Sequence, residues 1–342
     1  MIAFLFLSFT FSLDVSIIIN SDSTVIEGDS LVDAVNKSQG YSASDYFPFV
    51  FSIEVIEGSL TKADFQSDRA SFVDLYPFLS TFYISPKVVI IDDTIPAYSF
   101  SKHEMLESIT ICCYLASIQE RACSMCKNLK YFNATRLVSL EREVFALSLN
   151  LQIFSAPNLK ECQVSSFNGC SKLQSVNFPQ LQEIPALCFY DCSNLHTATF
   201  DSCTTVKLSA FQKCINLANV YLPLVTKAEA NIFNNCGVLK EISMPLLSNV
   251  PDFCFADCRQ LVNFDIGSPT TIEEYSFYNC LGLEEINFPN VTTIKSGCFS
   301  NCLNLRTVYL PLIDTILNSA FYYCISLVNI TFFYIYTIGS YS

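Results

Sequence analysis

The sequence predicts an α/β solenoid of about eleven stacked repeats, because three residue types recur together at one spacing. Phenylalanine returns every 22 residues, cysteine follows it by three positions, and leucine follows the cysteine by three more. A fixed period in this range is typical of stacked repeats, which offer a long binding surface rather than a catalytic pocket. The phenylalanine series is Phe145, Phe167, Phe189, Phe211, Phe233, Phe255, Phe277, Phe299 and Phe321.

The repeat that begins at Phe167 illustrates how one such unit, here called a rung, is expected to fold. Phe167, Cys170 and Leu173 are three apart, so they share one side of a helical turn that is short and partly 3₁₀. Val176 and Phe178 alternate with polar neighbours, as in a half-buried strand. A crossover joins the strands of successive rungs, so the sheet is predicted to be parallel.

The pattern extends towards the N-terminus in degenerate form. Cysteine takes the phenylalanine slot at Cys123, serine takes the cysteine slot at Ser148, and histidine takes it at His103. The rung that starts at Phe100 has one extra residue, so rungs of 22–23 residues are expected across a repeat domain of residues 84–342.

The N-terminal part lacks this register. Residues 17–83 are predicted to form a small capping region of unknown fold, because residues 25–28 and 55–58 repeat the motif Val-Ile-Glu-Gly and each precedes a candidate short helix. A separate adhesive domain is the alternative. Residues 1–16 are apolar and resemble a secretory signal peptide, the alternative being a first strand that caps the solenoid. No apolar run is long enough for a transmembrane helix, so no transmembrane segment is expected.

Composition and charge narrow the class of partner. Hydrophobic residues make up 51% of the chain and charged residues 15%, which the inward-facing sides of a solenoid explain without a membrane. The net charge is −13 and the pI is near 4.5, so no nucleic-acid partner is expected.

Seventeen cysteines raise the question of disulfides. Most of them recur at equivalent positions of successive rungs, where their side chains point in parallel rather than at each other. We therefore expect mostly reduced, buried thiols, with a disulfide framework as the alternative. Cys123 and Cys126 form a CxxC pair, but the repeat itself predicts an apolar residue and a cysteine at these places. Of Cys112 and Cys113, adjacent in an extended segment, at most one is expected to be buried.

Nothing in the sequence predicts an enzyme. The two histidines, His103 and His196, have no nucleophile or carboxylate at a spacing that suggests a catalytic triad. Glycine-rich phosphate loops are missing from the sequence, so no cofactor is expected. The CxxC pair could be half a zinc site, but the sequence has no second CxxC, so no metal is expected.

Four rungs follow one pattern at every slot, in which a leucine, apolar residues, a proline, a phenylalanine and a cysteine come in this order. These rungs are residues 217–236, 239–258, 283–302 and 305–324. This pattern resembles the BspA-type leucine-rich repeat of bacterial and protozoan surface antigens. The resemblance implies a leucine-rich repeat horseshoe and a protein ligand from a host, a matrix or another cell surface. Residues 201–203 and 267–268 depart from the pattern at the proline step, and no membrane anchor is visible.

Two functions are consistent with this resemblance. The first is a non-enzymatic, secreted or cell-surface adhesion protein, and the second is an intracellular, cytoplasmic scaffold. In such solenoids the outward strand positions line the concave face, where tyrosine is a common hot-spot residue. The alternative is that these are simply solvated strand positions. The candidate partner-binding residues are Asn219, Tyr221, Glu241, Ser243, Asn263, Asp265, Glu285, Asn287, Thr307 and Tyr309. Five of them, Tyr221, Glu241, Asp265, Glu285 and Tyr309, are expected to lie in one line across the strands.

Overall fold

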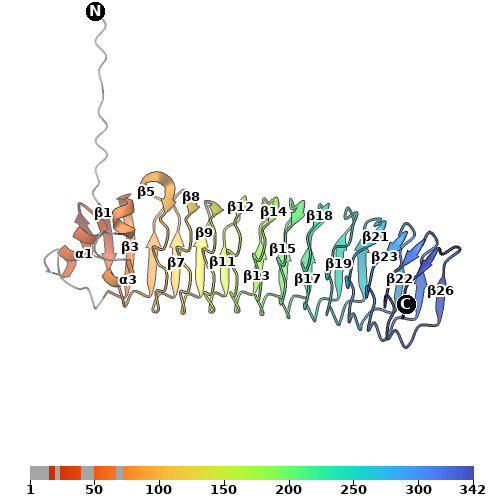
Figure 1. The fold of residues 1–342 in the computed structure, drawn as a ribbon. Helices are drawn as coiled ribbons and strands as arrows, with labels where there is room; N and C mark the ends of the chain where they lie inside the picture. The colour runs from red at the N-terminus through yellow and green to blue at the C-terminus, as the bar shows by residue number, and fades with distance from the viewer. Residues whose placement is uncertain (1–14, 20–23, 40–49, 67–71) are drawn as a thin grey trace, which may run out of the picture.

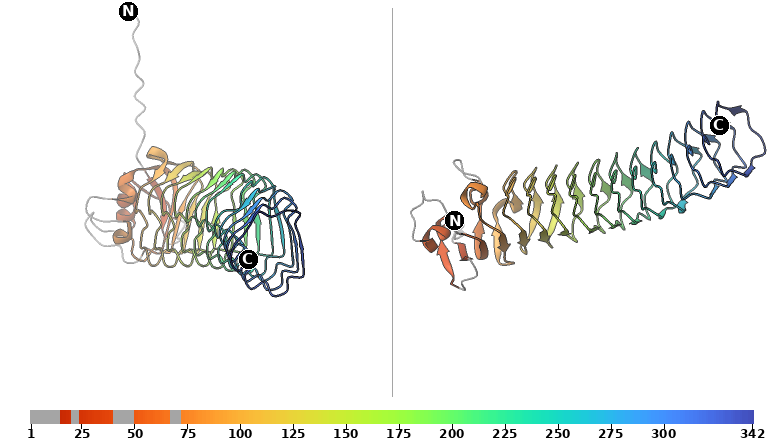
Figure 2. Two further views of the ribbon diagram at one scale, coloured as in Figure 1. Left: turned by 45° about the vertical axis from the view of Figure 1, so that its right-hand side comes forward. Right: turned by 90° about the horizontal axis from the view of Figure 1, so that it is seen from below.

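The rungs stack into one elongated, gently curved array of about eleven turns (Figures 1 and 2). The computed structural model describes residues 15–19, 24–39, 50–66 and 72–342. Residues 1–14 of the expected signal peptide lie outside this part, whereas Val15 and Ser16 belong to a paired strand of the cap. The predicted parallel-sheet solenoid is confirmed.

One long sheet, here called the main sheet, runs from the cap through most of the array, and every pairing from β3 onwards is parallel. β5 (Val88–Ile90) also pairs with β3. The strand order of the main sheet is β2 (Ile26–Gly28), β1 (Val15–Ile19), β3 (Ser52–Leu60), β4 (Thr81–Ile84), β7 (Ser108–Ile111), β9 (Tyr131–Ala134), β11 (Ile153–Ser155), β13 (Ser175–Asn177), β15 (Thr197–Thr199), β17 (Asn219–Tyr221), β19 (Glu241–Met244) and β20 (Asn263–Ile266).

The main-sheet row then continues as a separate sheet of β22 (Glu285–Asn287), β24 (Thr307–Tyr309) and β26 (Asn329–Thr331). A second row of short strands, here called the second sheet, runs beside it in three pieces. These pieces are β6 (Thr94–Ile95), β8 (Leu115–Ile118), β10 (Leu137–Leu140) and β12 (Glu161–Cys162); then β14 (Glu183–Ile184), β16 (Thr205–Val206) and β18 (Lys227–Ala228); and then β21 (Thr271–Ile272), β23 (Thr293–Ile294), β25 (Thr315–Ile316) and β27 (Thr337–Ile338).

The cap closes the N-terminal end of the main sheet with two strand–turn–helix units. β2 leads into α1 (Leu31–Gln39), and β3 leads into α2 (Lys62–Phe65), as the repeated motif predicts. The Asp64 carboxylate joins the two units, because it accepts hydrogen bonds from the backbone N–H groups of Leu31 at 2.8 Å and Thr61 at 2.7 Å. The remaining described helices, α3 (Phe72–Leu75) and the 3₁₀ turn η1 (Ile91–Asp93), also lie at this end.

The recurring phenylalanines form a continuous aromatic stack through the core. From Phe145 to Phe299 each side chain is fully buried, and Phe321 is half-buried. Neighbouring rings have centroids 5.2–5.7 Å apart and planes within 23° of parallel. The 22-residue register of the sequence is therefore the packing register of the fold.

The segment around each phenylalanine is a chain of tight turns rather than the expected helical turn. Around Phe167, the N–H groups of Ser165, Phe167 and Gly169 bond to carbonyls of the next rung, while those of Asn168 and Cys170 bond within the rung. To alternate in this way, the residues two positions before and two positions after the phenylalanine adopt a left-handed backbone conformation with positive φ, as Ser165 and Gly169 do. In a regular helix all these N–H groups would form hydrogen bonds within their own rung. No backbone hydrogen bonds would then join neighbouring rungs along this side.

The cysteine three residues past each phenylalanine has a specific hydrogen-bonding role. Its thiol donates to the carbonyl of the phenylalanine in the preceding rung, as from Cys170 to Phe145 at 3.1 Å and from Cys258 to Phe233 at 3.2 Å. Where serine fills the slot, the Ser148 hydroxyl donates to the Cys123 carbonyl at 2.7 Å. In these rungs the slot therefore holds a small side chain that can donate a hydrogen bond.

His103 fills the same slot in the first full rung and is buried. Its Nε2 donates to the Tyr76 carbonyl at 2.9 Å, and its Nδ1 accepts the Leu106 N–H at 3.2 Å. The second bond requires the neutral ring, because a protonated Nδ1 cannot accept a hydrogen bond. Burial accordingly lowers the pKa of His103 below its ordinary value of 6.5.

Protonation of His103 is expected to oppose folding. Above pH 6.5 His103 is neutral in both the folded and the unfolded chain, so its titration does not lower the free energy of unfolding there. As the pH falls through 6.5 the unfolded chain takes up the proton first, so stability falls by at most about 1.4 kcal/mol per pH unit until the folded pKa is reached. Urea unfolding between pH 8 and pH 5 should show this slope in the wild type and a flatter one in His103→Cys. Identical slopes would contradict the assignment.

Candidate functional site

The predicted binding residues lie on the outward face of the main sheet, in two rows rather than in one line. Strand register aligns Asn219, Glu241 and Asn263, and it aligns Tyr221, Ser243 and Asp265. Beyond β20 the rows continue with Glu285 opposite Thr307 and Asn287 opposite Tyr309. Nine of the ten side chains are exposed, and Thr307 is half-buried. Tyr221 and Glu241, expected in one line, thus stand in different rows because they differ by two places in strand register.

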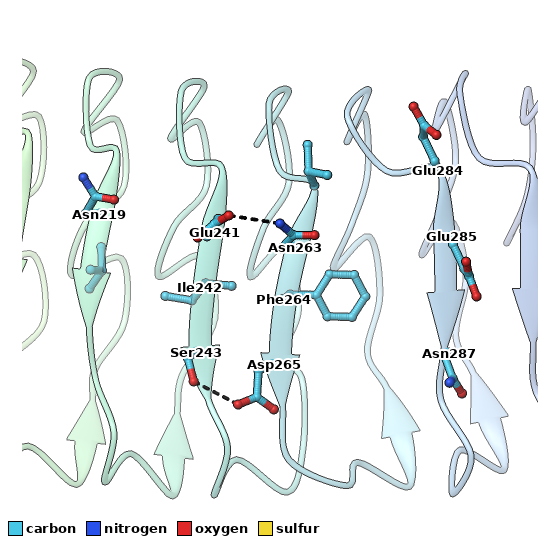
Figure 3. Close-up of a pocket in the computed structure, with 12 residues that line it drawn as sticks. Asn219, Glu241, Ile242, Ser243, Asn263, Phe264, Asp265, Glu284, Glu285 and Asn287 are labelled. Carbon is cyan, nitrogen blue, oxygen red and sulfur yellow. Dashed lines mark hydrogen bonds between the residues drawn. The ribbon is translucent and has the colours of Figure 1, made fainter.

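A hollow of about 810 Å³ interrupts this face between β17 and β22 (Figure 3). Seven of the predicted residues line it, whereas Tyr221, Thr307 and Tyr309 lie outside it. This hollow is here called the acidic hollow. It is lined by Asn219, Val220, Glu241, Ile242, Ser243, Val262, Asn263, Phe264, Asp265, Glu284, Glu285 and Asn287.

The hollow coincides with the interruption of the main sheet, since β20 does not pair with β22 among the described strands. Phe264 stands in the central strand slot where the flanking rungs carry Ile242 and Ile286, and its ring centroid lies 5.5 Å from that of Phe288 in the next rung. Figure 3 shows this ring pointing across the gap. The ring therefore lies beside the gap. Phenylalanine in this slot does not by itself prevent strand pairing, since Phe132 and Phe154 occupy it in the paired strands β9 and β11.

Gly267 follows β20 directly, at the position where most neighbouring rungs carry proline. It replaces the usual proline, and a Cβ atom here would lie 2.5 Å from the Leu247 carbonyl oxygen and 2.8 Å from that of Pro245. These are backbone atoms, so only glycine lets the rung approach its predecessor so closely.

The acidic hollow carries uncompensated negative charge. Glu241, Asp265, Glu284 and Glu285 line it without a lysine or arginine, and no ion pair of the described residues involves them. Two of these carboxylates are held by neighbouring strands, since the Asn263 side-chain N–H₂ donates to Glu241 at 3.0 Å and the Ser243 hydroxyl donates to Asp265 at 3.0 Å (Figure 3). Elsewhere carboxylates are neutralised across rungs, as Glu143 is by Arg121 at 2.6 Å.

Sequence reasoning missed Phe264 and Glu284 as members of this surface. Phe264 looked like an ordinary inward residue, and Glu284 lies just before the strand. The departure at residues 267–268 was the available signal, because it marks the irregular rung.

The CxxC pair is part of the core, as the repeat predicts. Cys123 and Cys126 are fully buried, and burial raises the pKa of Cys126 to about 12. The Cys126 thiol donates to the Phe100 carbonyl at 2.9 Å. In the described ranges, no group of three or more histidine, cysteine or acidic residues is placed to hold a metal ion. The helices described there are all too short or too polar to cross a membrane.

A parallel-sheet solenoid with an open, polar strand face is the fold of a leucine-rich repeat protein, a fold typical of non-enzymatic binding proteins. The family model described as "BspA type Leucine rich repeat region" matches residues 79–152, 138–261 and 248–342, with 6 copies. The chain therefore belongs to the BspA-type leucine-rich repeat family, as the resemblance predicted.

Solved structures of bacterial leucine-rich repeat proteins are similar in fold. A leucine-rich cell surface protein from Faecalibacterium prausnitzii is 18% identical, covering 93% of this chain and 93% of that chain, with a TM-score of 0.38. A leucine-rich repeat protein from Bacteroides ovatus is 19% identical, covering 84% and 91%, with a TM-score of 0.47. The pneumococcal vaccine antigen PcpA is 17% identical, covering 84% and 75%, with a TM-score of 0.40. No curated protein sequence matches this chain.

Proposed function

We propose that this protein is a non-enzymatic, protein-binding module that acts in adhesion, either secreted or displayed at a cell surface. The observation that carries the proposal is the acidic hollow on the main sheet. It combines an exposed polar surface across several rungs with four carboxylates that lack a cationic partner. Family membership supports the class of function.

The charge of the hollow favours a partner with basic character. Unpaired carboxylates grouped on one face create a negative potential that steers and orients a positively charged surface. Val262 and half-buried Phe264 add apolar area at the centre, where a partner would exclude water. The tyrosines Tyr221 and Tyr309 stand at the two sides of the hollow on the same face.

A charge-neutralised variant tests this assignment. Glu241→Gln, Asp265→Asn and Glu285→Gln together are expected to lower affinity for a basic protein partner by at least about tenfold at low salt, because the favourable field is lost. Melting temperature should stay close to wild type, since each residue is exposed. Binding to cell surfaces or matrix proteins, measured by surface plasmon resonance at several salt concentrations, should weaken with salt in the wild type.

A matched control variant removes the same number of negative charges at exposed positions outside the main-sheet strands. Its three substitutions are Asp201→Asn, Glu274→Gln and Asp314→Asn. This variant should bind like wild type. Equal binding by both triple variants would remove the acidic hollow as the site and direct the search to the cap.

Location is tested separately through the four Asn-x-Ser/Thr glycosylation sequons of the sequence, which are Asn36, Asn133, Asn290 and Asn329. Asn290 and Asn329 are exposed, whereas Asn36 is buried within α1. Passage through a glycosylating secretory pathway should therefore modify Asn290 and Asn329 first. A glycosidase-sensitive mobility shift that disappears in Asn290→Gln/Asn329→Gln is expected. A chain from such cells that carries no glycan would favour the intracellular scaffold.

A further inference from the structure

A second hollow, of about 640 Å³, lies where the second sheet is interrupted between β12 and β14. One cysteine, Cys162, lines it, and its sulfur lies 3.6 Å from the sulfur of Cys188 in the next rung. We propose that Cys162 and Cys188 form a redox-active dithiol, which closes to a disulfide when a small-molecule disulfide enters this hollow. The proposal rests on thiol geometry and is independent of the proposed binding function.

The two cysteines meet because they occupy different slots of successive rungs. Cysteines in equivalent slots point in parallel and donate to backbone carbonyls, as Cys192 does to Phe167 at 3.1 Å. Cys188 instead occupies the slot before phenylalanine, and Cys162 occupies a slot of the second sheet that holds Ile184 one rung later. Their side chains therefore converge.

Other rungs show that this contact needs both cysteines. Cys254 and Cys298 share the slot of Cys188, but Ala228 and Ile272 stand 26 places earlier, where Cys162 stands relative to Cys188. The Cys298 thiol donates to the backbone carbonyl of Glu273 at 2.9 Å instead. No other thiol–thiol hydrogen bond is found among the described residues.

The local structure supplies both access and freedom to close. Cys162 is half-buried and open to the hollow, whereas Cys188 is fully buried. β12 pairs with β10 and β14 pairs with β16, but β12 and β14 do not pair with each other. Because no strand hydrogen bonds join β12 to β14, the sulfurs can approach from contact to the roughly 2.05 Å of a disulfide bond.

The reaction is a thiol–disulfide exchange in two steps. The Cys162 thiolate attacks one sulfur of the small disulfide, which forms a mixed disulfide at Cys162 and releases one small thiol. The Cys188 thiolate then attacks the Cys162 sulfur, which forms the Cys162–Cys188 bond and releases the second small thiol. The two protein thiols supply the two electrons, the small disulfide is reduced to two thiols, and these carry away the two protons.

Oxidation of the reduced full-length chain with hydroxyethyl disulfide tests the proposal. After acid quench, denaturation and alkylation, the wild type should lose alkylation at both Cys162 and Cys188 and show a cross-linked peptide joining these two residues, whereas half-buried Cys112 can carry at most a mixed disulfide. Cys188→Ala, which copies Ala210 of the next rung, should stop at a mixed disulfide on Cys162. Cys162→Ile, which copies Ile184, should gain neither adduct nor cross-link at these positions.

Cys254→Ala is the matched control, because it changes the same slot in a rung without a facing thiol. It should form the Cys162–Cys188 cross-link as the wild type does. Full alkylation of the oxidised wild type, a stable mixed disulfide on wild-type Cys162, or a cross-link between another pair would each overturn the proposal. These outcomes are read from the wild-type chain, so they do not depend on how the variants fold.

Discussion

Replacing Phe255 with alanine is expected to lower the free energy of unfolding by about 3–5 kcal/mol, because the ring is fully buried in the middle of the aromatic stack. Its centroid lies 5.7 Å from that of Phe233 and 5.2 Å from that of Phe277. Truncation therefore leaves a cavity that two neighbouring rungs border. Urea unfolding followed by circular dichroism measures the loss.

The damage should stay local, since each rung of a solenoid contacts only its neighbours. Hydrogen exchange in Phe255→Ala is expected to rise most between Phe233 and Phe277 and to remain near wild type in the cap. Phe253→Ala is the matched control: the same side chain is removed two residues away, where it is 36% exposed. It should cost about 1 kcal/mol or less. A Phe255→Ala chain as stable as Phe253→Ala would show that the 22-residue register is wrong.

The core of this fold could be predicted because one physical requirement repeats in every rung. A phenylalanine, a small thiol or hydroxyl donor and a leucine must face inward at fixed spacing, so the identities themselves reveal the register. The serine at Ser148 keeps the size and the hydrogen bond of the cysteine that it replaces, whereas Cys123 keeps only the burial of the phenylalanine slot. The strand-turn-helix units of the cap were recognisable for a similar reason, as two copies of one short motif.

The backbone of the turns could not be predicted from residue types. Left-handed positions usually attract glycine or asparagine, but here they also hold Leu187, Phe253 and Tyr275. The conformation arises because alternate N–H groups must reach carbonyls of the next rung. This requirement comes from the stacking of rungs, so the sequence of a single rung does not reveal it.

The candidate site was predictable only in part. Alternation along each strand identified the outward residues, and nine of the ten are exposed. The hollow lies beside a rung that carries both Phe264 in the central slot and Gly267 at the proline step. Neither residue breaks the repeat pattern enough to indicate an interrupted sheet, since Phe132 and Phe154 stand in the same slot of paired strands.

Native-state alkylation should divide the seventeen cysteines into two classes that differ in rate by about 100-fold or more. Cys112 and Cys162 are half-buried and should react first, in a chain kept reduced and then freed of reductant. The other fifteen are buried, and burial raises the pKa of Cys113, Cys203 and Cys324 to about 11 in each case, so the reactive thiolate is scarce.

The ladder thiols in the middle of the array should be the slowest, because the pKa of Cys192 and its equivalents is raised still further and each rung is covered on both sides. A brief pulse of iodoacetamide at pH 8, with each site quantified by peptide mass spectrometry, measures these rates. Denatured protein provides the reference and should be modified at all seventeen positions. Fast labelling of Cys192, Cys236 or Cys280 in the native chain would mean that the thiols do not face the core, whereas missing sites in the denatured, reduced chain would point to covalent modification. Slow labelling of these three beside fast labelling of Cys162 is the result that the stacked-rung packing requires, because the same residue type differs in reactivity only through its slot.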